Sequence, residues 1–342
     1  MGVFSIGLSA LQTAQKVENM LAHNISNADT PGYKKLVEHN QEVMHGSQPG
    51  GVTTTIARSG NPFLDNRLNA ALGDAAEADA FNSGLKILNE NVKPKTTEEA
   101  FSTFMNATQD LNVNPNDASR QAAFDEAGKN FSTQLKALGD QFTTVTNQVT
   151  EARDYTQIEL DGIQKELSNL TSGPITDETQ SEIENLTRQV MMRTRSIAGY
   201  NKVLSGVIPP ITSMYTAARD AVVNGSNQSY GQDIIDTKGN FTFDPNNIGN
   251  VKALTEFGSQ QFNKDMGTMN TAMGAKLNSA ESSDKLYKDI LEGVQSDVAE
   301  QTGVDIVAET VRSKQYQRMY EAAAQIIKTQ DDMMGTLLNI RG

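Results

Sequence analysis

Near its N-terminus the chain reads Leu21-Ala22-His23-Asn24-Ile25-Ser26-Asn27-Ala28-Asp29-Thr30-Pro31-Gly32-Tyr33, and this stretch decides the fold. Upstream of it, apolar residues recur at steps of three and four, which predicts an amphipathic helix from about residue 3 to residue 26. Pro31 and Gly32 end that helix, because proline disfavours a helical conformation at Thr30 and glycine accepts a positive φ. The chain therefore begins with one helix that has an apolar face to bury.

The other end of the chain carries a matching helix. Residues 304–339 predict a helix on the order of 50 Å long at the standard rise. Its apolar line consists of Met319, Ala323, Ile326, Met333, Leu337 and Ile340. Each terminal helix can bury its stripe against the other. We therefore predict that they pair as a coiled coil, and that residues 1–48 and 301–342 form one assembly domain.

The middle of the chain is predicted to be a run of helices. The clearest pattern alternates by four and three, as in a coiled coil, along Phe124, Gly128, Phe131, Leu135, Leu138, Phe142, Val145, Val149 and Ala152. After a turn at 172–174, a partner helix with the same spacing predicts an antiparallel hairpin. Further helices are expected at 65–91, at 96–111 with a capping box of Thr96 and Glu99, and at 251–300.

Two stretches lack helical periodicity. Residues 34–62 are predicted to be an extended connector, with a possible short strand at 52–56. Residues 224–250 are predicted to be a small insert with a β-hairpin-like turn at 237–240. The fold class expected is mainly α: an elongated helical bundle, residues 49–223 plus 251–300, with paired terminal helices and that one insert.

Composition excludes several classes of function. Hydrophobic residues make up 37% and aromatic residues 6% of the 342 residues, which suits thin helical bundles. A formal net charge of −13 disfavours a nucleic-acid partner. There is no cysteine, so neither disulfides nor cysteine metal ligands are available. The sequence also has no apolar run of about 18 residues and no basic signal-peptide start, so we expect no membrane insertion and no ordinary signal-peptide route.

No catalytic or cofactor signature is present in the sequence. The three histidines, His23, His39 and His45, lack the close spacing of metal ligands. Asp331 and Asp332 are adjacent on a predicted helix and so point to different faces. The sequence therefore predicts a protein that is not an enzyme and holds no cofactor or metal.

At its two ends the chain resembles the flagellar axial superfamily of rod, hook and hook-associated proteins. That superfamily carries Asn-Ile-Ala-Asn-x-Asn-Thr-Pro-Gly-aromatic after its first helix, and residues 24–33 follow that pattern here. Its C-terminal pattern is matched by Tyr316-Gln317, by Ile326-Ile327-Lys328-Thr329 and by Leu337-Leu338-Asn339-Ile340. Together the two motifs cover about a fifth of the chain, and they are specific as a pair.

Within the superfamily the sequence looks most like the hook–filament junction proteins, which have helices between their termini where rod and hook proteins have β-rich domains. Residues 101–121 also resemble the first helical domain of the junction proteins. Two features depart from that pattern. Lys34-Lys35 follows the motif, as in rod and hook members, and the large inserted domain is reduced to about residues 224–250.

The resemblance implies a structural subunit that is exported unfolded by the flagellar type III system and folds on assembly. Its partners would be copies of itself, the hook protein below, a second junction protein above, and a cytoplasmic export chaperone on the C-terminal helix. It would reside outside the cell in the flagellum, after a transient cytoplasmic stage. The candidate assembly contacts are Leu11, Leu21, Asn24, Ile25, Asn27, Thr30, Pro31, Gly32, Tyr33, Tyr316, Tyr320, Ile326, Ile327, Met333, Leu337, Leu338 and Ile340.

Two alternatives remain open from the sequence. One is a rod or hook axial subunit, favoured by Lys34-Lys35. The other is a secreted helical binding or adhesion module that retains flagellar ends. The second alternative predicts a stable monomer with ordered termini, whereas an assembly subunit has terminal apolar stripes that need a partner.

Overall fold

The structure, a computed structural model, describes residues 2–28, 33–45, 48–174, 177–227, 234–236, 238–245 and 249–340. Long helices dominate these residues, so the predicted mainly α class is confirmed. The chain divides into two compact units. The terminal unit contains residues 1–68 and 292–342, and the bundle unit contains residues 69–291. The predicted division into an assembly domain, a bundle and a separate insert stays a prediction.

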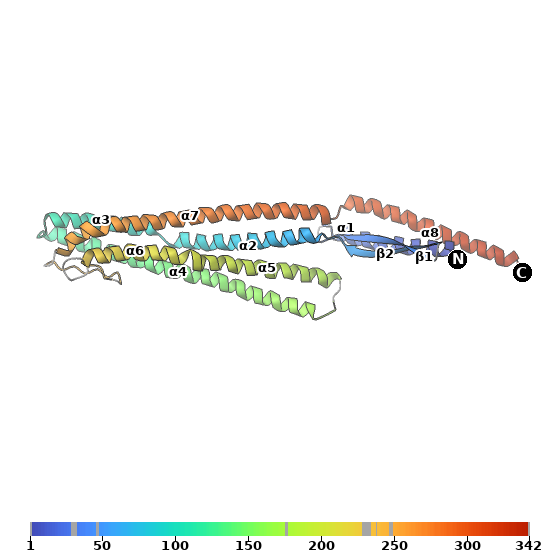
Figure 1. Cartoon of the computed structure of the whole chain (residues 1–342), viewed down its shortest axis with the longest axis horizontal. Coiled ribbons are helices and arrows are strands. Elements are labelled where there is room, and N and C mark those ends of the chain that lie inside the picture. Colours follow the sequence, from blue (N-terminus) through green and yellow to red (C-terminus); the bar gives the residue numbers. More distant parts are fainter. Residues whose placement is uncertain are drawn as a thin grey trace. The chain divides into compact units, whose positions relative to one another are not determined.

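The terminal unit is built on the helices at the two ends of the chain, as Figure 1 shows. Helix α1 (Gly2–Ser26) packs along α8 (Ile306–Ile340). It also packs on strands β1 (Leu36–His45) and β2 (Gln48–Arg58). The small core consists of Val17, Met20 and Leu21, with Leu36 and Tyr316 against it. The coiled-coil pairing expected of the terminal helices thus occurs within one chain.

The short strand predicted at 52–56 is confirmed within β2, but the rest of the connector predicted at 34–62 is not unpaired, because its larger part forms an antiparallel β-ribbon. The register runs from Leu36 opposite Arg58 to His45 opposite Gln48, with an irregularity at Val43/Met44. The ribbon lies on α1, where Ser9 Oγ accepts from the Val52 backbone N–H at 2.8 Å. Thr54 Oγ1 donates to Thr13 Oγ1 at 2.9 Å. Most side chains of β1 are polar, so the sequence shows no apolar alternation there. The strand is stabilised instead by backbone pairing with β2 and by packing on α1.

The bundle unit contains most of α2 (Pro62–Asn91) and α7 (Gly249–Thr302), whose outer ends belong to the terminal unit. Its other helices are α3 (Pro94–Val113), α4 (Ala118–Thr171), α5 (Asp177–Gly206) and α6 (Ile208–Asn227). The alternating pattern predicted from Phe124 to Ala152 lies on α4, and all of its residues except Ala152 are buried. Helices α4 and α5 pack together as the predicted antiparallel hairpin.

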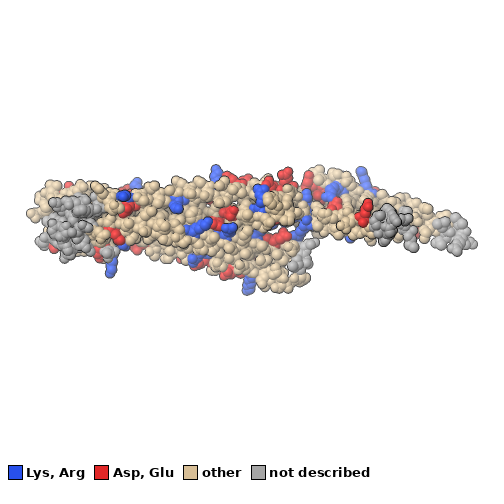
Figure 2. All heavy atoms as spheres, in the orientation of Figure 1, with Lys and Arg blue, Asp and Glu red and all other residues tan. Residues whose placement is uncertain are grey.

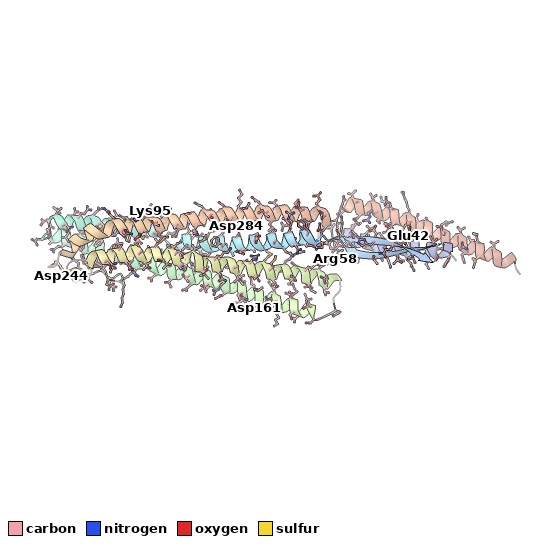
Figure 3. All side chains as sticks on the ribbon, viewed as in Figure 1. Glu42, Arg58, Lys95, Asp161, Asp244 and Asp284 are labelled. Atoms are coloured by element: carbon pink, nitrogen blue, oxygen red, sulfur yellow. The ribbon has the colours of Figure 1, made fainter. Side chains whose placement is uncertain are left out.

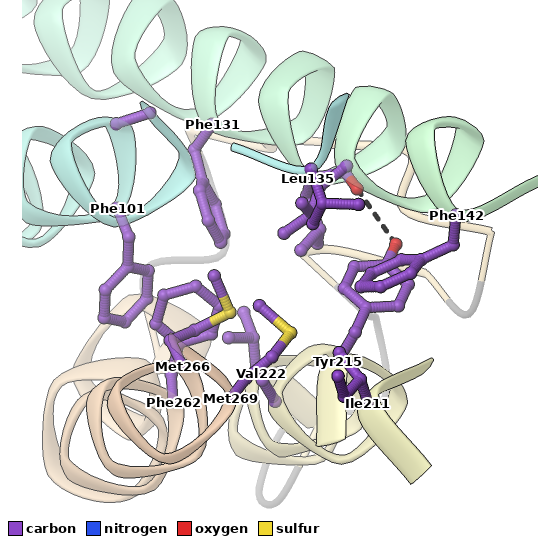
Figure 4. Close-up of a cluster of buried hydrophobic side chains, with 14 of the residues drawn as sticks. Phe101, Phe131, Leu135, Phe142, Ile211, Tyr215, Val222, Phe262, Met266 and Met269 are labelled. Carbon is purple, nitrogen blue, oxygen red and sulfur yellow. Dashed lines mark hydrogen bonds between the residues drawn. The ribbon is translucent and has the colours of Figure 1, made fainter. Parts of the chain in front are cut away.

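Aromatic rings form the centre of the bundle core, as Figure 4 shows. Phe101 lies 5.1 Å from Phe131 and 4.0 Å from Phe262, measured between ring centroids. Nearby, Tyr215 donates its hydroxyl proton to the Leu135 carbonyl at 2.9 Å. The core therefore joins α3, α4, α6 and α7 into one body.

Two local predictions in the bundle unit have different outcomes. The capping box of Thr96 and Glu99 does not start α3, since the helix begins at Pro94 with no side-chain cap at Lys93. Proline suits this first position because its missing N–H would have no helical partner. In the insert, the expected β-hairpin-like pairing is present as an antiparallel bridge between Ile235 and Phe241. Thr237, a residue of the expected turn, lies outside the described residues.

Candidate assembly interface

The residues singled out from the sequence fall into four groups. Leu21 and Asn24 are fully buried. The half-buried residues are Leu11, Ile25, Asn27, Tyr33, Tyr316 and Ile327. The exposed ones are Tyr320, Ile326 and Met333. The last group cannot be placed, because Thr30, Pro31, Gly32 and the side chains of Leu337, Leu338 and Ile340 lie outside the described residues.

Close approach of α1 to α8 depends on a small residue. At Gly7 an added Cβ would lie 3.1 Å from Ile327 Cγ1 and 3.5 Å from Ile326 Cγ2. Farther along the pair, Ser313 Oγ on α8 donates to the Glu18 carboxylate on α1, at 3.1 Å to Oε2. The two helices are thus held by both packing and a hydrogen bond.

Asn24 joins three elements of the terminal unit. Its carboxamide oxygen accepts from the Leu36 backbone N–H at 2.8 Å and from the Tyr33 hydroxyl at 2.9 Å. Its amide nitrogen donates to the Leu36 carbonyl at 2.9 Å and to Glu309 Oε2 at 3.2 Å. A fully buried side chain with its polar atoms paired in this way fixes the end of α1 against both β1 and α8.

A charged cluster continues from Asn24 along the same face of α8. Arg312 hydrogen-bonds Glu38 of β1 and lies 3.4 Å from Glu309 Oε1. Tyr316 donates its hydroxyl proton to Glu38 Oε1 at 3.3 Å. Burial by itself raises the pKa of Glu38, but the hydrogen bond and positive charge of Arg312, with help from Tyr316, hold that pKa below its usual value. The charged form of Glu38 therefore stabilises the contact between β1 and α8.

This lowered pKa predicts that the terminal unit weakens in acid. The pKa of Glu38 is lower in the folded than in the unfolded chain, where it is near 4.5. The ionised carboxylate therefore stabilises the folded state fully at pH values above the unfolded-state pKa. It is lost as the pH falls through the folded-state pKa. Hydrogen exchange of β1 amides should therefore accelerate below about pH 4.5 relative to the intrinsic rate, and less so in a Glu38→Gln variant. Equal acceleration in both proteins would contradict this role of Glu38.

Sequence reasoning missed the charged partners Glu38, Glu309 and Arg312. A usable signal was present, because Glu309 and Arg312 precede Tyr316 by seven and four residues and so continue the apolar line of α8 toward its start. Charged residues on an inward line indicate a buried ion pair, but its partner Glu38 lies on a strand that the pattern did not reveal.

Pairing within one chain leaves part of the apolar surface of both terminal helices uncovered. On α1, Phe4 is 48% and Leu8 is 41% exposed. On α8, Ile326 is 44% and Met333 is 55% exposed. We call these four residues the terminal stripe. Exposed apolar residues of this number on paired helices favour a protein-contact role, because burying them removes apolar area from water.

Metal groups and membrane spans are two other kinds of feature, and neither occurs in the part of the chain that the structure describes. No group of three or more histidine, aspartate or glutamate side chains there could hold a metal ion. None of the described helices is long and apolar enough to cross a membrane.

Comparison with known families adds an assignment to this geometry. Residues 4–34 match the family model described as flagella basal body rod protein. Residues 295–340 match the model described as flagellar basal body rod FlgEFG protein C-terminal. A search of curated protein sequences gave no match. The two ends of the chain, which the fold brings together as α1 and α8, are thus similar to the N-terminal and C-terminal parts of flagellar rod and hook axial proteins, and this similarity supports a flagellar axial structural subunit.

Proposed function

We propose that this chain is a hook–filament junction subunit, of the type called hook-associated protein 1. The observation that carries the proposal is the fold between the two axial ends. The described residues of the bundle unit form long helices, with one isolated β-bridge in residues 234–245. In the resemblance drawn from the sequence, helices between the termini distinguish junction proteins from rod and hook proteins with their β-rich domains.

In this proposal the terminal helices assemble into the inner wall of a tube. Residues 1–48 and 301–342 would form the assembly domain, and the candidate contacts named from the sequence would lie within or between subunits. Burial of the terminal stripe against neighbouring copies supplies the driving force. The chain would leave the cell unfolded through the type III apparatus, escorted by a chaperone on the C-terminal helix. It would then fold between the hook protein and a second junction protein.

A rod or hook subunit is the second candidate, favoured by the matched rod models and by Lys34-Lys35. The structure offers a local reason for Lys34, and it places the Lys35 backbone against the end of α7. Lys34 Nζ lies 2.8 Å from Asp65 Oδ1 at the start of α2. The Lys35 backbone N–H donates to the Thr302 carbonyl at the end of α7, at 2.9 Å. Lys34 therefore has a structural role within the terminal unit that does not depend on a rod or hook position.

Deletion of the gene distinguishes the two candidates. If the chain is a junction subunit, mutant cells should carry complete hooks without filaments and should release filament protein into the medium. Electron microscopy of isolated hook–basal bodies provides the measurement, with a plasmid copy of the gene as the control. Mutant cells that lack hooks would instead support a rod or hook subunit. Normal filaments would contradict both.

A further inference from the structure

A groove lies in the bundle unit between α2, α5 and α7, with a volume of about 380 Å³. Aromatic rings and charged groups of both signs line it. They belong to Asp74, Glu77, Phe81, Arg195, Lys202 and Tyr287. Lys and Arg side chains gather over the middle of α2 and α5 in the face that Figure 2 shows. The residues that line this groove all belong to the bundle unit, whereas the terminal helices belong to the terminal unit.

The α5 wall of the groove is basic. Arg188, Arg195 and Lys202 are spaced by seven residues, which places them in one line along the helix. Residues 185–206 contain no aspartate or glutamate. Arg195 lies 3.0 Å from Glu77 of α2, and Lys202 also pairs with that carboxylate. The side chains of Arg195 and Lys202 nevertheless remain 50% and 63% exposed. These two cations share the single carboxylate of Glu77, so they stay accessible to a further carboxylate from another molecule.

Beside the residues that line the groove, α7 carries two exposed apolar side chains, Leu286 and Ile290, which we call the groove rim. Leu286 is 56% and Ile290 is 44% exposed. They lie one turn apart on α7, and Leu286 is next to Tyr287, whose ring lines the groove. A helix with an apolar centre and acidic flanks would therefore match this groove in both charge and polarity.

The outer face of α4 has that character. Tyr155 and Ile158 are 65% and 68% exposed and lie one turn apart, away from the buried line of the helix. Acidic residues flank them at Glu151, Asp154 and Asp161. Arg153, which pairs with Asp154 at 2.6 Å, is the one basic residue among residues 151–161. In Figure 3, Asp161 of α4 and Asp284 of α7 lie at a similar level along the bundle unit and on opposite sides of it. The α4 face and the groove rim can therefore meet at one level when two copies stand side by side.

We propose that the outer face of α4 in one copy docks into the α2–α5–α7 groove of a second copy of this chain. Tyr155 and Ile158 would contact Leu286, Ile290 and the aromatic lining, and the acidic flanks would face Arg188, Arg195 and Lys202. The two surfaces differ, so each copy can bind a neighbour on both sides, and the contact repeats into a ring or helix. This inference rests on the proposed function, to which it adds a lateral contact between bundle units.

Disulfide cross-linking of the full chain tests this contact. The natural sequence has no cysteine, so each substituted chain carries a single thiol and every disulfide dimer reports one defined contact. An Ile158→Cys chain mixed with a Leu286→Cys chain at high concentration should give a disulfide heterodimer on mild oxidation. The matched control mixes Ile158→Cys with Thr268→Cys, which is exposed on the same helix but about 27 Å away along it. We expect at least about tenfold more heterodimer from the first mixture.

Charge complementarity provides a second readout. Adding Asp154→Lys and Asp161→Lys to the Ile158→Cys chain should lower the heterodimer yield several-fold, while circular dichroism confirms unchanged helix content. A yield from Ile158→Cys with Leu286→Cys no higher than the control, or preferential cross-linking of Ile158→Cys to itself, would overturn the inference. The assay needs no flagellum, so such a failure would leave the junction proposal to the deletion experiment.

Discussion

Replacing Ile326 by aspartate should abolish incorporation of the chain into flagella while leaving the helical bundle folded. Ile326 is 44% exposed on α8, within the terminal stripe. In the isolated chain a carboxylate at this position can stay hydrated. Between subunits the same carboxylate would be buried without a partner, and that cost exceeds what one assembly contact contributes. Complementation of the deletion strain with Ile326→Asp should therefore restore no filaments.

The matched control for this variant is Gln325→Asp. Gln325 is exposed on α8 and lies on the side away from buried Ala323, so the same carboxylate there remains in water. Gln325→Asp should support filaments, and both variants should show the parent's thermal transition for the bundle helices by circular dichroism. Normal filaments from Ile326→Asp would show that the stripe is not a contact between subunits.

Replacing Asn24 by leucine should destabilise the terminal unit by about 2–4 kcal/mol. The substitution removes the hydrogen bonds to Leu36, Tyr33 and Glu309, and leaves the backbone groups of Leu36 and a buried carboxylate without that partner. The local free energy of opening is measurable by hydrogen exchange, and amides of β1 and of the first turns of α8 should exchange roughly 30- to 1,000-fold faster.

Asn27→Leu is the control within the same sequence motif. The Asn27 side chain donates to the His23 carbonyl at 2.9 Å at the exposed end of α1, so its loss should cost less than about 1 kcal/mol. Amides of α4 in the bundle unit should exchange at the parent rate in both variants. Equal effects of the two leucine substitutions on exchange would contradict the role of Asn24 in holding α1 against β1 and α8.

The helices were predictable because long apolar lines determine them. The α4 line from Phe124 to Val149 is buried as the spacing predicts. Its one glycine, Gly128, also has a reason, since an added Cβ there would collide with the ring of Phe241 from the insert. The start of α4 also follows from local sequence, because Asp117 Oδ1 accepts from the backbone N–H groups of Ser119 and Arg120 and so caps the helix.

The β-ribbon and the Asn24 cluster were not predictable in the same way. Strand β1 carries few apolar residues, and its pairing with β2 depends on backbone hydrogen bonds that leave no periodic trace. The partners of Asn24 lie on β1 and on α8, the latter 285 residues away in sequence, so only the folded chain brings them together. The sequence motif marked Asn24 as important but gave no indication of which groups it binds.

The central claim is that the terminal stripe becomes buried between copies when the chain assembles. Hydrogen-exchange mass spectrometry of the free chain and of the chain in isolated flagella tests this most directly. We predict that amides in residues 4–26 and 306–336 gain strong protection on assembly, whereas the α4 core at 124–149 is equally protected in both states. Equal protection of the terminal helices in the free and assembled chain would contradict the claim, because the apolar faces of α1 and α8 would then already be covered within one chain.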